Sequence, residues 1–368
     1  MLQITTSLRQ VGASVDVVAL NQKKFRVDAP AIDTIDIDTS DYTSAAMRMW
    51  RLRVPLLVAR FYSPRFKSLL REKLRTTQYD IVHLEGQFLL PYVPAIRAET
   101  RAPIVLRAQN VEHAIWQHLA QQASGLRRMA LRQVARSLGA WETAHLDDCD
   151  ALVPIAEEDA HAFRELGAMR PMLVLPCGIE ASDVDAGIDR HRVYFLGSML
   201  YRPNREAASW LAQDVWPRVL ALEPRARLTI AGSSFARTLR DELAGPGIDM
   251  ATDVPDIRAF AVPFRAMLAP LFSGSGMRIK VLEAMAMGKP VIATPLGAGG
   301  VAVAPGENIL IASDPDELAQ LVVRCMNDDA LAERIGRAAR ALVVERYDPD
   351  VLARHLIAFY ETLLRNAS

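Results

Sequence analysis

The chain has 368 residues, with a hydrophobic fraction of 51% and a charged fraction of 23%. These values are typical of a globular protein, and the length suits two domains better than one. Basic and acidic residues both total 43, so the formal net charge is zero. This balance argues against a protein dedicated to nucleic acid, which usually carries a basic excess.

The sequence lacks the usual signatures of metal, disulfide and membrane-spanning proteins. Its three cysteines form no Cys-x-x-Cys pair, and its seven histidines form no His-Glu-x-x-His motif. No apolar run approaches the roughly 18–20 residues of a membrane-spanning helix, and the first residues do not resemble a signal peptide. We therefore expect a soluble, cytoplasmic protein without a metal site.

Short β-branched runs alternate with amphipathic stretches, a pattern that predicts an α/β fold with parallel sheets. The chain opens on a helix that contains Ile4 and Leu8 and ends near Gly12, whereas a nucleotide-binding fold usually opens on a strand and a glycine-rich turn. The first strand is thus expected to be missing, through truncation, a misassigned start or a natively incomplete domain. Strands of this domain are predicted at residues 15–19, 81–84, 104–107, 151–155 and 172–175.

An acidic, glycine-bearing segment predicts the boundary between two domains. We expect a first domain over 1–178, a linker over 179–192 and a second domain over 193–350. The final helix, within 351–368, has an apolar stripe and is expected to pack back on the first domain. Strands of the second domain are predicted at residues 193–196, 227–231, 248–251, 266–270, 290–294 and 309–311.

The most informative segment follows the predicted strand 266–270. Gly274 and Gly276 form a turn that lets the backbone approach a ligand at a helix start, where free N–H groups favour phosphate. Arg278 and Lys280 lie in the first helical turn, where cations are unfavourable unless an anion compensates them.

Glu283 stands in an otherwise apolar part of the same helix. A carboxylate in such a setting needs partners, and it can accept two hydrogen bonds from a ribose diol. The simpler interpretation is a Lys280–Glu283 pair on a solvated helix face. The glycine turn, the two cations and the carboxylate together favour a nucleotide-diphosphate site.

Over essentially its whole length the sequence resembles the family 4 glycosyltransferases of the GT-B fold, especially bacterial polysaccharide-type sugar transferases. The most specific match is Lys280-Val-Leu-Glu283-Ala-Met-Ala-x-Gly-x-Pro-Val. Supporting segments run in the expected order and start at Tyr79, Leu106, Pro154, Leu175, Phe195 and Ile230. The resemblance implies two Rossmann-like domains facing across a cleft, with no metal or cofactor. It also implies that the second domain, 193–350, binds a nucleotide-diphosphate sugar donor and that the first domain, 1–178, is the acceptor-side domain. The sugar would be transferred, with retention, to a hydroxyl acceptor.

The resemblance also suggests individual residue roles. Glu283 matches the glutamate that binds the ribose, and Gly276 and Met277 match backbone contacts to the sugar and diphosphate. Val254 matches the nucleobase position, and Gly197 matches the glycine after the first strand of the donor domain. We expect Arg278 and Lys280 to neutralise the diphosphate, with help from Arg202. The predicted catalytic set is Arg278, Lys280 and Glu283, and the remaining predicted donor contacts are Gly197, Arg202, Val254, Gly274, Ser275, Gly276 and Met277.

Some positions depart from the family pattern. Ser275 stands where the family has a first glutamate, and Gln109 stands where many relatives have a histidine. Glutamine cannot move a proton, so it can only position a hydroxyl group. Both departures also suit a catalytically silent nucleotide-sugar-binding homologue or complex partner, which is the alternative function. A sugar-nucleotide epimerase is a third possible function. The predicted acceptor-side residues are Glu85, Gln109, Asn110 and Glu112.

Residues 47–78 contain nine basic residues and one acidic residue, with apolar residues between them. Such a segment can lie on anionic lipid, which would place the protein at the inner face of the cell membrane. The alternative is a surface helix with a solvated basic face. A second basic group, Arg127, Arg128, Arg132 and Arg136, is interpreted as a solvated helix face.

Overall fold

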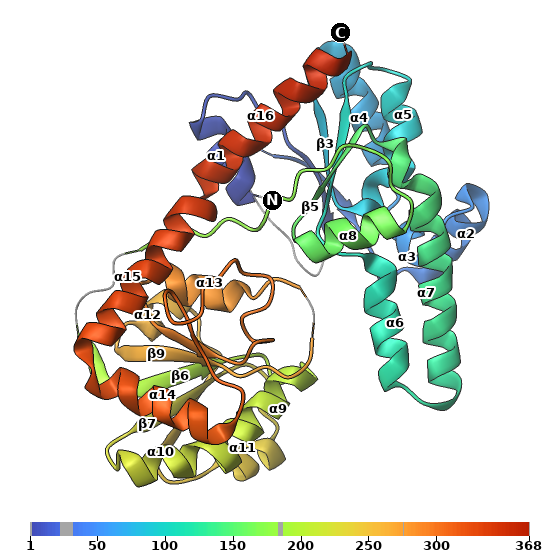
Figure 1. The fold of residues 1–368 in the computed structure, drawn as a ribbon. Helices are drawn as coiled ribbons and strands as arrows, with labels where there is room; N and C mark the ends of the chain where they lie inside the picture. The colour runs from blue at the N-terminus through green and yellow to red at the C-terminus, as the bar shows by residue number, and fades with distance from the viewer. Residues whose placement is uncertain (1, 23–31, 183–186, 275, 368) are drawn as a thin grey trace. The chain divides into compact units, whose positions relative to one another are not determined.

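The computed structural model describes residues 2–22, 32–182, 187–274 and 276–367. The chain divides into two compact units (Figure 1). Unit 1 comprises Met1–Pro176 together with Ala353–Ser368, and unit 2 comprises Cys177–Leu352. Both units are α/β structures with parallel strands.

Unit 2 contains one parallel six-stranded sheet in the order β11-β10-β9-β6-β7-β8. Its strands are β6 (Asp189–Leu196), β7 (Arg227–Gly232), β8 (Ile248–Thr252), β9 (Phe264–Ala269), β10 (Val291–Ala293) and β11 (Leu310–Ile311). Its helices are α9 (Arg202–Trp210), a π-helical turn (Leu211–Val215), α10 (Trp216–Leu222), α11 (Arg237–Leu243), α12 (Ile257–Ala261), α13 (Ile279–Ala286), α14 (Pro315–Asn327) and α15 (Asp329–Arg346). Because β6 begins at Asp189, the last four residues of the predicted linker are strand instead.

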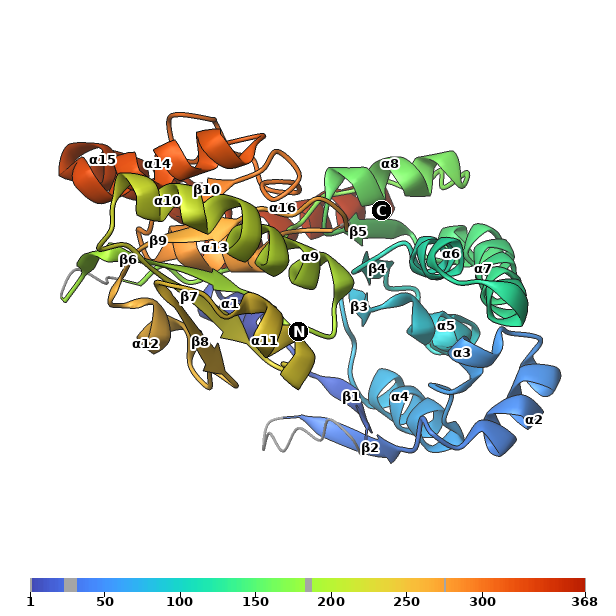
Figure 2. The same ribbon diagram turned by 90° about the horizontal axis from the view of Figure 1, so that it is seen from below.

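Helices cover both faces of this sheet (Figure 2). Alternate residues of β6 point to opposite faces, as the pleat of a strand requires. Val193 and Phe195 belong to one buried cluster, with residues of α9, α10 and α14. Tyr194 and Leu196 belong to the other, with residues of α13 and α15. The central strands are therefore buried on both sides, which explains their continuous apolar sequence.

Unit 1 contains two parallel sheets, β1-β2 and β3-β4-β5. The strands are β1 (Val18–Gln22), β2 (Asp33–Ile37), β3 (Val82–Glu85), β4 (Ile104–Ala108) and β5 (Ala151–Pro154). The helices are α1 (Leu2–Gln10), α2 (Tyr42–Leu52), α3 (Leu56–Ala59), α4 (Pro64–Thr76), α5 (Val93–Arg97), α6 (Glu112–Gln122), α7 (Gly125–His145) and α8 (Glu157–Glu165), with 3-10 turns at Gln87–Tyr92 and Leu146–Asp148. The helix α16 (Pro349–Ala367) belongs to unit 1 from Ala353 onward.

Three strand predictions in unit 1 differ from the structure. β1 begins three residues later than predicted, and β2 has no counterpart among the predicted strands. Residues 172–175 form a single bridge, between Met172 and Leu152, instead of a strand. β2 escapes prediction because Asp33 and Asp36, of a residue type that is uncommon in strands, interrupt its short β-branched sequence, and three of its five residues are exposed.

The basic segment 47–78 folds into parts of α2, all of α3 and α4, not into one amphipathic helix. Within α4, Phe66 is buried in the core of unit 1. Arg71 and Arg75 both pair with Glu99, at 2.5 and 2.7 Å, and Lys73 pairs with Asp33 at 2.7 Å. Three of the five basic side chains of α4 thus have acidic partners within unit 1.

Candidate functional site

The strand order of unit 2 defines where a ligand can bind. Counted along the chain from β6, the order is 3-2-1-4-5-6, so the connections change direction between β6 and β9. In such sheets ligands bind beyond the carboxyl ends of the strands at this switch point. Gly197 follows β6, and the Gly274–Arg278 turn follows β9. The structure thus places both predicted donor segments at the switch point.

The packing at this edge of the sheet requires a glycine at position 197. A Cβ atom at position 197 would lie 2.7 Å from the Asn204 side chain. Asn204 is held in place because its Nδ2 donates a hydrogen bond to the Ser198 carbonyl, at 2.9 Å. Only glycine therefore lets α9 start so close to the end of β6.

Lys280 and Glu283 connect α13 to this edge. The Lys280 ammonium donates a hydrogen bond to the Leu196 carbonyl, at 3.2 Å, at the carboxyl end of β6. Burial lowers the pKa of Lys280, and burial raises the pKa of Glu283. Both half-buried charges lie near the start of a helix, where an anionic ligand that also offers hydroxyl groups would satisfy them.

Arg278 is the N-cap residue of α13. Its guanidinium donates hydrogen bonds to the Gly274 carbonyl, at 3.1 Å, and to the Leu296 carbonyl, at 3.3 Å. It thereby joins the turn after β9 to the loop after β10. That loop includes Gly297, where a Cβ atom would lie 1.8 Å from the Ala269 carbonyl oxygen. The sequence analysis did not include this second loop, although its Gly-Ala-Gly-Gly run signals close backbone approach.

The remaining predicted donor residues lie around the same edge or outside the described residues. Met277 is partly buried, and Val254 follows β8 and packs against a buried cluster. Gly276 is exposed, with φ of +84°. Arg202 is exposed and pairs with Glu206 on its own helix, at 2.6 Å, so it has a local carboxylate partner. Ser275 lies outside the described residues.

Tyr201 is a further candidate donor residue that the sequence analysis missed. A Cβ atom at position 274 would lie 2.7 Å from the Tyr201 hydroxyl, so this group adjoins the glycine turn. Nothing in the local sequence marks Tyr201, because its proximity to Gly274 depends on the pairing of β6 with β9.

In unit 1, Glu85 ends β3 within a buried charged cluster. Its carboxylate lies 3.3 Å from His83 Nε2 and 3.4 Å from the Arg107 guanidinium. Burial alone would raise the pKa of Glu85, but the hydrogen bond from His83 and the charges of His83 and Arg107 lower it to about 2. Tyr360 of α16 hydrogen-bonds the other nitrogen of His83, at 2.5 Å. Glu85 is therefore an ionised, largely buried group rather than an exposed contact residue.

Gln109, Asn110 and Glu112 follow β4 at the same edge of unit 1. Gln109 and Asn110 are exposed, and the Asn110 carbonyl accepts a hydrogen bond from Gln87, at 2.8 Å. The backbone N–H of Glu112 donates to the carboxylate of Glu142, at 2.9 Å. Burial and the charge of Glu142 raise the pKa of Glu112 to about 7.

Asp159 is a second carboxyl group with a raised pKa in this unit. It lies in the first turn of α8, directly after β5. Burial and the charge of Glu158 raise the pKa of Asp159 to about 6. Perturbed carboxyl groups at the carboxyl ends of parallel strands are typical of functional sites. The sequence analysis quoted this segment but assigned Asp159 no role.

The described residues contain no group of three or more His, Cys, Asp or Glu side chains placed to hold a metal ion. No helix in the described ranges has both the length and the apolarity to span a membrane.

Two α/β domains with parallel sheets are the architecture of GT-B proteins. Comparison with known families agrees: residues 1–178 match a glycosyl transferase 4-like domain, and residues 190–328 match the glycosyl transferases group 1. The chain belongs to these glycosyltransferases.

Two related sequences match very different shares of this chain. A phosphatidyl-myo-inositol mannosyltransferase of Mycobacterium leprae is 27% identical over 372 residues, which cover 96% of this chain and 92% of that protein. A Klebsiella pneumoniae protein, described as an uncharacterized 44.6 kDa protein in the cps region, is 26% identical over 164 residues, 42% of each chain.

Solved structures share the fold. Sucrose-phosphate synthase from Thermosynechococcus elongatus matches 99% of this chain and 92% of its own, with a TM-score of 0.69 and 17% identity. Anabaena HepE in complex with UDP and glucose matches 90% of this chain and 86% of its own, with a TM-score of 0.61 and 15% identity.

Proposed function

We propose that this glycosyltransferase moves a hexose, with retention of anomeric configuration, from a nucleoside diphosphate sugar to a hydroxyl group of a glycolipid or saccharide acceptor. The observation that carries the proposal is the joint placement of Lys280 and Glu283 at the switch point of unit 2. The Mycobacterium leprae relative supports mannose as the first sugar to test and a phosphoinositide lipid as the first acceptor. The resemblance to family 4 enzymes supports retention.

The proposed mechanism is electrostatic. Negative charge builds on the diphosphate as it leaves the sugar, and cations and N–H groups already fixed at that place stabilise it. Lys280 and the Arg278 guanidinium, at the start of α13, would supply this stabilisation. Glu283 would accept hydrogen bonds from the ribose hydroxyl groups. On the acceptor side, Glu112, with a pKa of about 7, is suited to exchange a proton with an acceptor hydroxyl near neutral pH.

A transfer assay tests the proposal. Labelled GDP-mannose or UDP-glucose is incubated with vesicles that contain phosphatidylinositol, and label in the lipid extract is counted; NMR of the product gives its anomeric configuration. We expect one donor to label lipid with wild-type protein and label to fall to background with Glu283→Ala. Inverted product contradicts retention, and absence of transfer to lipid or to free saccharides contradicts the proposed activity.

A catalytically silent nucleotide-sugar-binding homologue is the second candidate function, because Gln109 is exposed where many relatives have a histidine. A glutamine there cannot carry a proton between substrates. Release of nucleoside diphosphate, measured beside the transfer assay, separates the two functions. A silent protein binds a nucleoside diphosphate but releases none from any nucleotide sugar, whereas an enzyme without its acceptor still hydrolyses its donor slowly.

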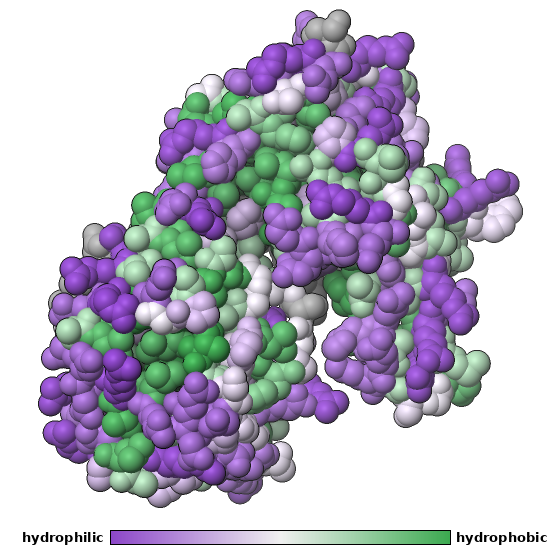
Figure 3. All heavy atoms as spheres, in the orientation of Figure 1, coloured by the Kyte–Doolittle hydropathy of each residue, from purple (hydrophilic) through white to green (hydrophobic). Residues whose placement is uncertain are grey.

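We further propose that, within residues 47–78, the predicted membrane contact is made by α2. Trp50 and Met47 are 83% and 70% exposed, and the exposed Arg51 and Arg53 follow Trp50 in the chain. The tip of the α6–α7 hairpin carries a similar combination, with Leu126 and Met129 exposed and no acidic residue between positions 113 and 141. The hairpin projects from unit 1, and its sides are mainly hydrophilic (Figures 1 and 3). Exposed apolar side chains beside arginines suit an anionic lipid surface.

Vesicle sedimentation tests this contact. We expect co-sedimentation with phosphatidylglycerol vesicles at low salt, a loss with phosphatidylcholine vesicles, and a loss on Trp50→Ser. Leu222→Ser in unit 2, where the side chain is 57% exposed, is the matched control and should sediment like wild type. Equal binding by the Trp50 variant would exclude α2 as the contact.

A further inference from the structure

Glu142 of α7 is a buried carboxylate to which the proposed mechanism gives no role. Its side chain is 0% exposed, and burial of a charged group is costly unless hydrogen bonds satisfy it. Its two oxygens accept hydrogen bonds from the backbone N–H groups of Glu112 and His113, at 2.9 and 3.1 Å. Glu142 therefore holds the start of α6, which follows the carboxyl end of β4.

The same carboxylate also holds the imidazole ring of His113. Nδ1 of His113 lies 2.6 Å from Oε2 of Glu142. Because both oxygens of Glu142 already accept backbone N–H groups, as an ionised carboxylate does, Nδ1 carries the proton of this hydrogen bond. The other nitrogen of the neutral ring, Nε2, then has a lone pair and acts as a hydrogen-bond acceptor.

Packing against α7 fixes the orientation of the His113 ring. α6 and α7 lie side by side as a hairpin (Figure 1). A Cβ atom at position 139 would lie 3.3 Å from Cγ of His113, so Gly139 lets the ring rest against the helix. The His113 side chain is still 14% exposed, and among the described residues no hydrogen bond reaches its Nε2. This nitrogen is therefore open to a ligand.

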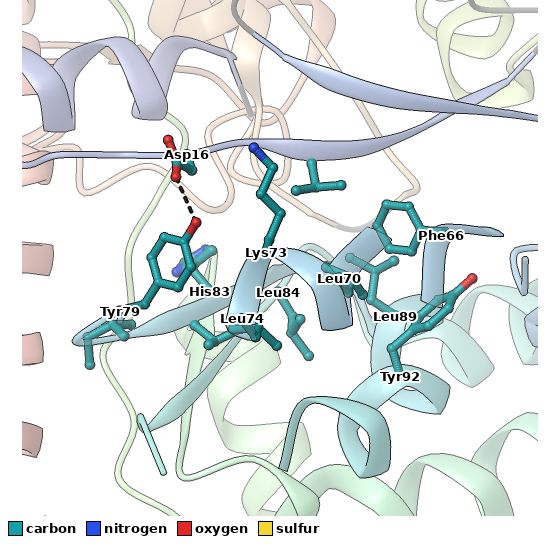
Figure 4. Close-up of a pocket in the computed structure, with 13 residues that line it drawn as sticks. Asp16, Phe66, Leu70, Lys73, Leu74, Tyr79, His83, Leu84, Leu89 and Tyr92 are labelled. Atoms are coloured by element: carbon teal, nitrogen blue, oxygen red, sulfur yellow. Dashed lines mark hydrogen bonds between the residues drawn. The ribbon is translucent and has the colours of Figure 1, made fainter. Parts of the chain in front are cut away.

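His83 also lies beside a largely buried glutamate, but its ring has no open nitrogen. It lines a cavity of about 130 Å³ in unit 1 (Figure 4). Its Nδ1 is hydrogen-bonded to Tyr360, at 2.5 Å, and its Nε2 lies 3.3 Å from Glu85. Both nitrogens of His83 thus face protein groups, whereas only one nitrogen of His113 does. Of these two histidines, His113 is the one that can bind a ligand.

The chemistry of Nε2 indicates the class of ligand. A lone pair on nitrogen accepts a hydrogen bond from a hydroxyl group, whereas an ionised carboxylate has only lone pairs to offer. His113 follows Glu112, the residue proposed to exchange a proton with the acceptor, at the edge of a parallel sheet where ligands bind. Successive residues of a helix point about 100° apart, so these two side chains would reach different hydroxyl groups.

We propose that Nε2 of His113 binds a hydroxyl group of the acceptor, and that Glu142 is the positioning residue that keeps Nδ1 protonated and Nε2 free. The inference deepens the proposed function and rests on it. It names the acceptor class as a polyol or saccharide, including the headgroup of an inositol lipid, because one hydroxyl group reacts while His113 binds another. A simple alcohol has no second hydroxyl group for this contact.

NMR of the His113 ring tests the role of Glu142 without any substrate. Long-range proton–nitrogen spectra of protein with ¹⁵N-labelled histidine are recorded at about pH 8, where imidazole is ordinarily neutral. The His113 signals are assigned by their loss in His113→Asn. We expect a proton on Nδ1 and none on Nε2 in wild type. Glu142→Gln should move the proton to Nε2, because the amide can donate to Nδ1.

The wild-type spectrum decides this part even where Glu142→Gln fails to fold. A proton on Nε2 in wild type would overturn the proposal, because Nε2 could not then accept a hydrogen bond. An unchanged ring in folded Glu142→Gln would overturn the positioning role of Glu142.

Acceptor kinetics test the binding role of His113. Transfer from the nucleotide sugar is measured at varied concentrations of phosphatidylinositol in vesicles and, as a soluble saccharide, of methyl α-mannoside. In His113→Asn the amide can still donate to Glu142, but no atom replaces Nε2. We expect the KM for the acceptor to rise about three- to tenfold, as for one lost hydrogen bond, and the KM for the nucleotide sugar to change less than about twofold.

His118→Asn is the matched control. His118 is exposed on the same helix, where its ring is hydrogen-bonded to Gln122, at 2.8 Å, and the variant should behave like wild type. An unchanged acceptor KM in His113→Asn, or equal losses in both histidine variants, would overturn the inference and leave the proposed function standing. Wild-type protein that labels neither acceptor would overturn both.

Discussion

The ionisation of Glu112 should affect the stability of the fold as well as the proposed proton exchange. Its folded-state pKa of about 7 lies above the ordinary value of 4.5, so the folded protein binds more protons between these pH values. Its contribution to the free energy of unfolding therefore falls as pH rises from about 4.5 to about 7. Above pH 7 the folded state carries the full cost of the buried charge.

Glu112→Gln should remove this cost. We expect the variant to be more stable than wild type by about 1–3 kcal/mol at pH 8 and to differ little at pH 4.5. Urea unfolding at both pH values measures the difference. A gain of equal size at both pH values would show that the charge of Glu112 is not the cause.

Lys280 and Arg202 offer a matched pair of cations for the donor site. Lys280 contacts the end of β6, whereas Arg202 is exposed and paired with Glu206. We expect Lys280→Met to weaken binding of nucleoside diphosphate by about 10- to 100-fold, or about 1.4–2.8 kcal/mol, and Arg202→Met to weaken it less than about threefold. Isothermal titration calorimetry gives both constants. Equal losses would place Arg202 on the diphosphate, as the sequence analysis predicted.

The turn between β9 and α13 is the element on which the proposed donor site depends. Gly274 has φ of +106°, and a Cβ atom there would lie 2.7 Å from the Tyr201 hydroxyl. Gly274→Ala should therefore strain the turn and weaken donor binding at least about tenfold. Gly306→Ala is the control, because Gly306 has φ of +79° and open space around its Cβ position. Both variants should lose stability, but only the first should lose affinity for nucleoside diphosphate in calorimetry.

The elements that sequence reasoning predicted well are those with strong local signals. The strands around Val193 and Leu268 are continuous apolar runs, and the glycines before α13 mark a turn at the start of a helix. β2 was missed, and residues 172–175 were wrongly predicted as a strand, because a short edge strand depends on its neighbours. The same reason hides Tyr201, whose place beside Gly274 depends on the pairing of β6 with β9 and not on its own sequence.

At the scale of the whole molecule, unit 1 is discontinuous in sequence. The last part of α16 belongs to it, with Leu356 and Leu363 buried and Tyr360 bonded to His83. Deletion of residues 353–368 should lower the free energy of unfolding of unit 1 by about 3–5 kcal/mol, because two buried leucines lose their contacts. Hydrogen exchange should accelerate in β4 and stay unchanged in β7. Equal acceleration in both strands would contradict the assignment of this segment to unit 1.

Sequence predicts the two-domain α/β architecture of this glycosyltransferase, but it does not give the strand order on which the site depends. The order follows from pairing between distant segments, such as Tyr194 with Met267. Likewise, the approach of Lys280 to Leu196 joins residues 84 positions apart. The residues of the proposed donor site could be named from the sequence, whereas their placement around the switch point required the structure.

Calorimetric titration of wild type, Glu283→Gln and Glu283→Ala with UDP, GDP and ADP tests the central claim most directly. We expect one nucleotide to bind wild type with micromolar affinity, with about a tenfold loss for Glu283→Gln and a larger loss for Glu283→Ala, because the ribose hydroxyl groups lose a charged acceptor. If no nucleotide binds the folded wild-type protein, or if all three proteins bind one equally, the edge of unit 2 at α13 is not the donor site.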